Sequence, residues 1–193
     1  MEMQTDSDVE TMLLGPLLPD RVCGDCTACC TTLTVDSPDF KKPPGTPCVH
    51  LGARGCGIHA VRPHICRTWF CGWRRVAAMP DAARPDRSGM LVSINFVRKP
   101  RNCLEGVSIN VRLLPGSTAI ADGTAANVLD SLCDDLVPVW FSDGARKMLV
   151  HPDAEVAQHV LASTAAPAHL RDEVAAWRTR YGMFDPDGRA IDR

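Results

Sequence analysis

The sequence has few aromatic residues and no apolar run long enough to cross a membrane. Aromatic side chains make up 5% of its 193 residues, and tyrosine occurs once. The first twenty residues are acidic, and their apolar part is interrupted by Gly15, Pro16 and Pro19. A secretory signal needs a basic start and a longer apolar stretch. We therefore expect a cytoplasmic protein of bacterial type with no membrane contact.

Several signatures of common enzymes are also missing from the sequence. It contains no nucleophile elbow, no phosphate-binding loop and no paired carboxylates spaced for acid–base work. A glycine-rich strand-to-helix loop of the kind that binds dinucleotides or S-adenosylmethionine is absent as well. No catalytic residue is predicted, and whether the chain is an enzyme stays open.

Cysteine, by contrast, is abundant, with ten residues in a chain that is 45% hydrophobic. Disulfides do not persist in a reducing compartment, where clustered cysteines bind metals or carry out redox chemistry. Eight of the ten lie within residues 23–71. Cys103 and Cys133 stand apart, and we expect both to be inert: Cys133 falls on the apolar face of a predicted helix and Cys103 in a loop.

The first cysteines follow the spacing of a metal-binding loop. Cys23, Cys26 and Cys29 form two successive Cys-x-x-Cys steps, which let thiolates converge on one metal while a remote cysteine completes the site. Cys30 directly follows Cys29, and adjacent side chains point in different directions, so Cys30 is expected to serve a second site or to support the first. Four more candidate ligands follow: Cys48, Cys56, Cys66 and Cys71.

Eight thiols can form two four-ligand sites, or one cluster with spare thiols. The triple spacing is like that of bacterial ferredoxins and favours a 4Fe–4S cluster, whereas the eight separate thiols favour zinc. We expect an iron–sulfur cluster, with zinc as the alternative cofactor. Whether Cys30 and Cys71 are ligands is left open.

Charge is distributed unevenly along the chain. Residues 41–112 hold thirteen basic and three acidic side chains, and the segments on either side are acidic. Such a segment suits a protein partner or nucleic acid, or it offsets the negative charge of metal–thiolate sites. We favour charge compensation over nucleic-acid binding, because the segment lacks the interleaved aromatic residues of a base-stacking surface.

The patterning predicts an α+β fold in which a small irregular metal-stabilised region packs on an antiparallel sheet with C-terminal helices. Alternation predicts paired strands at 90–97 and 107–114, and a hairpin turning at 142–144. Helices are expected over 124–136, 153–163 and 167–181. The predicted divisions are an acidic segment (1–20), the cysteine-cluster region (21–88), the α+β region (89–182) and a polar tail (183–193).

Three stretches carry a resemblance to a known family: CGDCTACC (23–30), PCVHL (47–51) and GCGIHAVRPHICRTWFCGW (55–73). Together they resemble the CxxCxxCC, or YkgJ-type, cysteine-cluster family, which has eight characteristic cysteines and is described as zinc- or iron-chelating. Two positions depart from its pattern. His59 stands where the family has tyrosine, and Phe70 follows Trp69, which occupies the usual aromatic position. We expect His59 to pack or hydrogen-bond rather than to bind metal.

This resemblance implies a metal-binding protein with a redox or metal-handling role. A zinc-stabilised structural or interaction module is the first alternative. The family also includes flagellin lysine N-methylases, so a metal-dependent modifying enzyme is the second. The triple spacing is not the Cys-x-x-x-Cys-x-x-Cys run of radical S-adenosylmethionine enzymes, which disfavours that chemistry.

Overall fold

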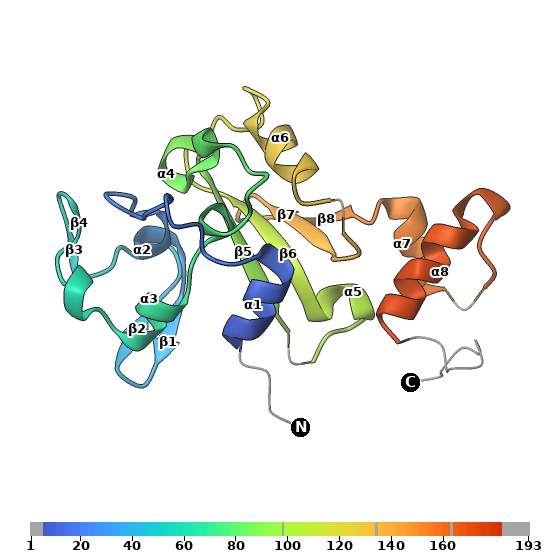
Figure 1. The fold of residues 1–193 in the computed structure, drawn as a ribbon, viewed down its shortest axis with the longest axis horizontal. Coiled ribbons are helices and arrows are strands. Elements are labelled where there is room, and N and C mark those ends of the chain that lie inside the picture. The colour runs from blue at the N-terminus through green and yellow to red at the C-terminus, as the bar shows by residue number, and fades with distance from the viewer. Residues whose placement is uncertain (1–5, 98, 134, 163, 183–193) are drawn as a thin grey trace.

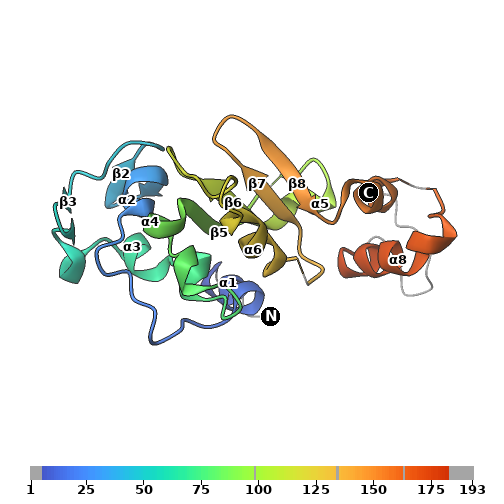
Figure 2. The same ribbon diagram turned by 90° about the horizontal axis from the view of Figure 1, so that it is seen from above.

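The structure, a computed structural model, describes residues 6–97, 99–133, 135–162 and 164–182. At its centre is one four-stranded sheet in the order β5-β6-β7-β8, formed by β5 (Met90–Phe96), β6 (Val107–Leu113), β7 (Val139–Ser142) and β8 (Lys147–His151). The cysteine-rich segment lies at one end of the molecule and the C-terminal helices lie at the other, with the sheet between them (Figures 1 and 2).

The predicted α+β class is confirmed, and both predicted strand pairs form. β5 pairs with β6 and β7 with β8, each antiparallel. The sheet as a whole is mixed rather than antiparallel, because β6 and β7 run parallel. The connection between them contains α6 (Thr124–Asp130), and a helix that crosses over a sheet returns the chain in its original direction. The alternation of apolar and polar residues along a strand does not indicate whether the neighbouring strand runs parallel or antiparallel to it.

The main hydrophobic core lies on one face of the sheet. Met90 and Val92 of β5, Val111 of β6 and Val139 of β7 are each 2% exposed or less. Val128 of α6 covers this face and is fully buried. The predicted helix over 124–136 ends early, at Asp130: the Leu132 amide bonds the Leu129 carbonyl, and Leu132 turns into the core.

An N-terminal helix that the sequence analysis did not expect packs against this core. In α1 (Asp6–Leu14), Leu14 is buried, and the Glu10 carboxylate accepts a bond from Arg75 at 3.1 Å. Both members of this ion pair are buried. Arg75 also donates to the Thr11 hydroxyl and the Gly15 carbonyl, each at 3.2 Å. The described part of the acidic segment therefore packs on the folded core through residues 10–15.

The two predicted C-terminal helices form α7 (Ala154–Leu161) and α8 (Arg171–Arg180), with a 3-10 turn, η4 (Ala168–Leu170), before the second. Asp153 caps α7 by accepting the Val156 amide at 3.0 Å. Trp177 of α8 is fully buried in a second apolar cluster. The predicted polar tail, 183–193, lies outside the described residues, as does Ser163, at the predicted end of the first helix.

The cysteine-rich segment contains only short elements. They are α2 (Ala28–Thr32), β1 (Val35–Ser37), β2 (Phe40–Lys42), β3 (Leu51–Gly52), β4 (Gly55–Cys56), η1 (His59–Val61) and α3 (His64–Thr68). The chain then continues through η2 (Gly72–Arg74), η3 (Asp81–Ala83) and α4 (Pro85–Ser88), and α5 (Cys103–Gly106) follows β5. All of residues 21–71 are described, and only Ala28, Lys42 and Gly55 among them are buried. No large apolar side chain forms a core in this segment.

Within the described part of the chain, the helices are all too short or too polar to cross a membrane.

Candidate metal centre

The first four cysteines come from a turn and a short helix. The Cys26 amide bonds the Cys23 carbonyl at 3.0 Å, and Gly24 within this turn takes a positive φ of 56°. Glycine adopts this conformation without the steric cost that a Cβ imposes. Cys29 and Cys30 then lie next to each other in α2. The Cys-x-x-Cys spacing therefore forms a compact turn.

Arg21 ties this turn to the chain beyond the last cysteine. Its guanidinium donates to the carbonyls of Trp73 at 2.7 Å, Val76 at 2.9 Å and Met79 at 2.6 Å. It also stacks on the Trp73 ring, 5.3 Å from the ring centroid. One side chain thus joins the start of the cysteine-rich segment to residues of the main core more than fifty positions later.

Cys48 and Cys56 are brought to α2 by backbone hydrogen bonds. The Cys48 amide bonds the Cys30 carbonyl at 2.9 Å, and the Leu51 amide bonds the Cys48 carbonyl at 3.0 Å. In the small β3–β4 hairpin, Leu51 pairs with Cys56. Cys30, Cys48 and Cys56 therefore belong to one continuous set of backbone contacts.

Cys66 and Cys71 follow on α3 and the loop after it. Arg62 donates to the Cys66 carbonyl at 2.8 Å and to the His59 carbonyl at 2.8 Å, which fixes the entry to α3. Gly72 packs directly on the sheet, since a Cβ there would lie 2.5 Å from Val92 Cγ1. A glycine at this position lets the chain that carries Cys71 lie against β5.

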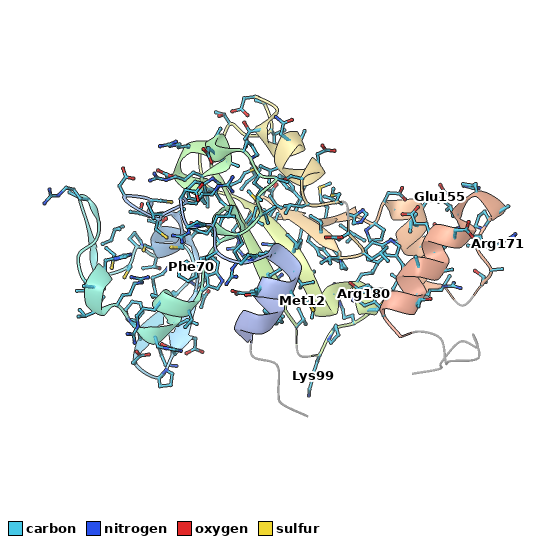
Figure 3. All side chains as sticks on the ribbon, viewed as in Figure 1. Met12, Phe70, Lys99, Glu155, Arg171 and Arg180 are labelled. Carbon is cyan, nitrogen blue, oxygen red and sulfur yellow. The ribbon has the colours of Figure 1, made fainter. Side chains whose placement is uncertain are left out.

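All eight predicted cysteines line one cavity of about 590 Å³. It lies between the cysteine-rich segment and the face of β5 and β6 opposite the hydrophobic core. Figure 3 shows sulfur atoms gathered at this end of the molecule, near Phe70. Cys103 and Cys133 do not line the cavity and pack instead against the two apolar clusters. The eight predicted site residues are therefore brought together, and the two others are not.

Electrostatic contacts divide the eight thiols into two groups. The pKa of Cys71 is raised to about 11, chiefly by burial and in part by negative charge at Cys23 and Cys26. The pKa of Cys29 is raised by its hydrogen bond with Cys30, by burial, and by Cys23 and Cys71. These contacts define the first group: Cys23, Cys26, Cys29 and Cys71.

The second group centres on Cys66. Burial raises the pKa of its thiol, and the next contributions come from Cys30, Cys48 and Cys56. Cys30 belongs here rather than with Cys29, although the hydrogen bond from the Cys29 thiol lowers the pKa of Cys30. The second group is therefore Cys30, Cys48, Cys56 and Cys66, and the Cys29–Cys30 contact joins the two groups.

Within residues 6–97, 99–133, 135–162 and 164–182, no three His, Cys, Asp or Glu side chains converge closely enough to hold a metal ion as they stand. The thiols share a cavity without forming a finished coordination shell. Their chemistry nonetheless fits a metal, because thiolates are the ligands that zinc and iron–sulfur clusters prefer.

Positive charge surrounds the thiols. The described residues in the cavity wall include no carboxylate. Five cationic side chains line it: Lys42, Arg62, Arg74, Arg84 and Arg112. Lys42 is 5% exposed and donates to the Thr46 carbonyl at 2.8 Å. Arg84 bonds Asp25 and lies 2.7 Å from Asp86. The placement of these cations supports the interpretation that the basic segment offsets thiolate charge.

His59 lies at the rim of the cavity and is exposed. Its Nδ1 is 3.2 Å from Arg62, so the ring sits in a hydrogen bond with the arginine that fixes α3. The hydrogen-bonding role expected from the sequence is consistent with this contact.

The opposite wall of the cavity was not predicted from the sequence. Ser93 of β5 and Asn110 and Arg112 of β6 line it, and Leu91 lies beside them. Their signal in the sequence was the polar half of each alternating strand, which is also what a solvent-facing strand shows. Only the placement of the cysteine-rich segment reveals that this face is covered.

Comparison with known proteins gives no relative: no family model matches the chain, and no curated protein or solved structure matches it either.

Proposed function

We propose that the protein binds metal through its eight clustered cysteines as two four-thiolate sites. The observation that supports this most is the shared cavity: eight thiols spread over 49 residues of chain line it, while the other two cysteines pack elsewhere. The first site takes Cys23, Cys26, Cys29 and Cys71. The second takes Cys30, Cys48, Cys56 and Cys66. This division places the adjacent Cys29 and Cys30 in different sites.

Iron–sulfur clusters are the favoured occupants, and zinc is the alternative. The first group reproduces the ferredoxin arrangement of a three-cysteine run completed by a remote cysteine. A bound 4Fe–4S cluster would supply one-electron transfer, and zinc would supply a structural link. In either case four thiolates around each centre leave a net negative charge, which the surrounding arginines and Lys42 offset.

The resemblance to the CxxCxxCC cysteine-cluster family supports the same proposal through the residues that carry it, Cys56 to Arg67 and the cysteine run at 23–30. A redox or metal-handling role follows from clusters close to a cavity. The zinc-stabilised interaction module is the alternative if both centres hold zinc.

Purification without oxygen, followed by metal and sulfide analysis and a visible absorption spectrum, tests the proposal. We expect iron and acid-labile sulfide and a broad visible band. A colourless protein with two zinc ions would replace the cluster assignment with the zinc alternative. Protein that stays free of metal after reconstitution with iron and sulfide, and with zinc, would overturn the proposal.

Single substitutions test the division into two sites. Cys71→Ser and Cys66→Ser should each remove about half of the bound metal, and the double variant should remove nearly all of it. Cys133→Ser is the matched control and should keep the full content, because Cys133 packs in the main core. Loss of all metal in either single variant would argue for one shared site.

A further inference from the structure

The wall of the cavity opposite the cysteines is formed by one face of β5 and β6. Ser93 pairs directly with Asn110, and Leu91 pairs with Arg112. Paired residues of neighbouring antiparallel strands project from the same side of a sheet. These four side chains all line the cavity, whereas Val92 and Val111 face the hydrophobic core.

Two of these side chains are polar, buried and without a partner. Asn110 is 4% exposed and Ser93 is 9% exposed. Neither side chain forms a hydrogen bond with the described part of the chain, and the small surface each retains opens into the cavity. The fully buried side-chain atoms that lack a partner do not include those of Asn110 and Ser93, so the polar atoms of both residues still reach the cavity. A ligand in the cavity would supply the missing partners.

Two arginines in the cavity wall are also available to a ligand. Lys42, Arg62 and Arg84 are engaged by backbone carbonyls or by aspartates. Arg112 and Arg74 form no ion pair or side-chain hydrogen bond with the described residues. The Arg74 guanidinium lies over the Phe70 ring, 5.3 Å from its centroid, and its Nε is buried without a partner. Guanidinium groups bind carboxylates and phosphates through paired N–H donors.

Apart from Asn95 of β5, the cavity is also lined by large apolar side chains. Trp69 and Phe70 line it together with Leu91. A largely apolar cavity with a few converging polar groups is the usual form of a small-molecule site. The whole cavity measures about 590 Å³, and the eight thiols line part of it.

We propose that the sheet side of this cavity binds a small organic anion with an apolar body, whose carboxylate or phosphate is held by Arg112 and Asn110. The aromatic wall would take the apolar body, and the ligand would lie beside the cysteine groups. This site is additional to the proposed metal sites and does not depend on which metal they hold. Charge compensation alone does not account for Asn110 and Ser93, since these side chains are neutral and would not offset thiolate charge.

The test uses the full chain purified without oxygen, with metal content measured for every sample. Benzoate, phenyl phosphate and the neutral isostere benzamide are titrated, and binding is followed by ligand-observed NMR. We expect at least one of the two anions to bind about tenfold more tightly than benzamide. Asn110→Ala should weaken anion binding by about fivefold to tenfold without changing the metal content. Arg112→Gln should weaken it by a similar factor in samples matched for metal content. Arg54→Gln, an exposed arginine outside the cavity, should leave binding unchanged.

A preference for benzoate over phenyl phosphate, or the reverse, identifies the anionic group and supports the site in either case. Equal binding of all three probes, or anion binding that neither substitution weakens, would overturn the proposal. If Arg112→Gln changes the metal content but not probe binding, Arg112 serves only to offset thiolate charge, which would overturn the proposal. If Asn110→Ala does not fold, Ser93→Ala on the paired strand replaces it, with the same expected loss. Absence of metal from the wild-type protein bears on the metal proposal alone.

Discussion

The sheet region and the cysteine-rich segment of this protein are stabilised in different ways. The sheet and its helices bury a continuous set of apolar side chains, with Val111, Val128 and Val139 fully excluded from solvent. Residues 21–71 bury only Ala28, Lys42 and Gly55. Apolar burial is the main force that folds a domain, so the sheet region needs nothing else. The cysteine-rich segment relies on side chains that reach backbone carbonyls, such as Arg21 and Arg62, and on the metal that we propose.

Removing the metal should have the largest effect, and it should act on one region only. In protein purified with metal, chelation should expose residues 21–71 to proteolysis and hydrogen exchange, because metal binding energy is folding energy in a segment without a core. The strands of the sheet should keep their protection. Unchanged protection of residues 21–71 after complete metal removal would show that the carbonyl-directed arginines are sufficient by themselves.

Breaking the buried ion pair should destabilise the sheet region next most strongly. Glu10→Ala leaves the Arg75 guanidinium buried without its charge partner, which costs about 3–5 kcal/mol in the free energy of unfolding. Denaturant titration measures this cost. Lys41→Ala removes an exposed ion pair with Asp36 and is the control, with an expected change of less than about 1 kcal/mol. Equal effects of the two substitutions would mean that α1 does not contribute to the core.

A pair of apolar truncations compares the two regions directly. Met90→Ala removes a side chain that is 1% exposed and should cost about 2–5 kcal/mol. Val61→Ala, in the cysteine-rich segment, removes a side chain that is 77% exposed and should change stability by less than about 0.5 kcal/mol. Thermal or denaturant unfolding followed by circular dichroism distinguishes them. A large effect of Val61→Ala would contradict the absence of a core in that segment.

The smallest effect concerns the only tyrosine. Burial raises the pKa of the Tyr181 hydroxyl to about 12, above the value of about 10 for an exposed tyrosine. Because the pKa is higher in the folded state, this group's contribution to stability is complete below pH 10 and is lost as the pH rises through about 12. Tyrosinate absorbance follows the titration directly, since the sequence holds a single tyrosine. A midpoint near 10 in protein that is still folded would contradict the burial of this ring.

Much of the fold could be predicted from local patterns. The alternation in 90–97 and 107–114 gave β5 and β6, and the turn at 142–144 gave the β7–β8 hairpin. Asp153 caps α7 where the helix start was predicted. The parallel pairing of β6 with β7 and the docking of α1 could not be predicted, because both depend on contacts between segments far apart in the sequence.

The candidate site, like the fold, could be predicted from the sequence only in part. Cysteine spacing and number pointed to all eight cysteines that line the cavity, because a thiol cluster in a segment without a core has few roles other than metal binding. The division of the thiols that we propose could not be predicted from the sequence: it assigns Cys71 to the first group and Cys66 to the second, although only four residues separate them. It depends on contacts between distant segments, such as the backbone hydrogen bond from Cys48 to Cys30.

By itself, the sequence determined the number and the spacing of the thiols, which are read directly from the chain. It also determined the strands and helices whose periodicity is local. Only the tertiary structure decided that Ser93, Asn110 and Arg112 face the cysteines rather than water. The physical reason is that a polar strand face has the same pattern whether solvent or another segment covers it. The covering segment, which is held by few apolar contacts, is what turns that face into one wall of a cavity.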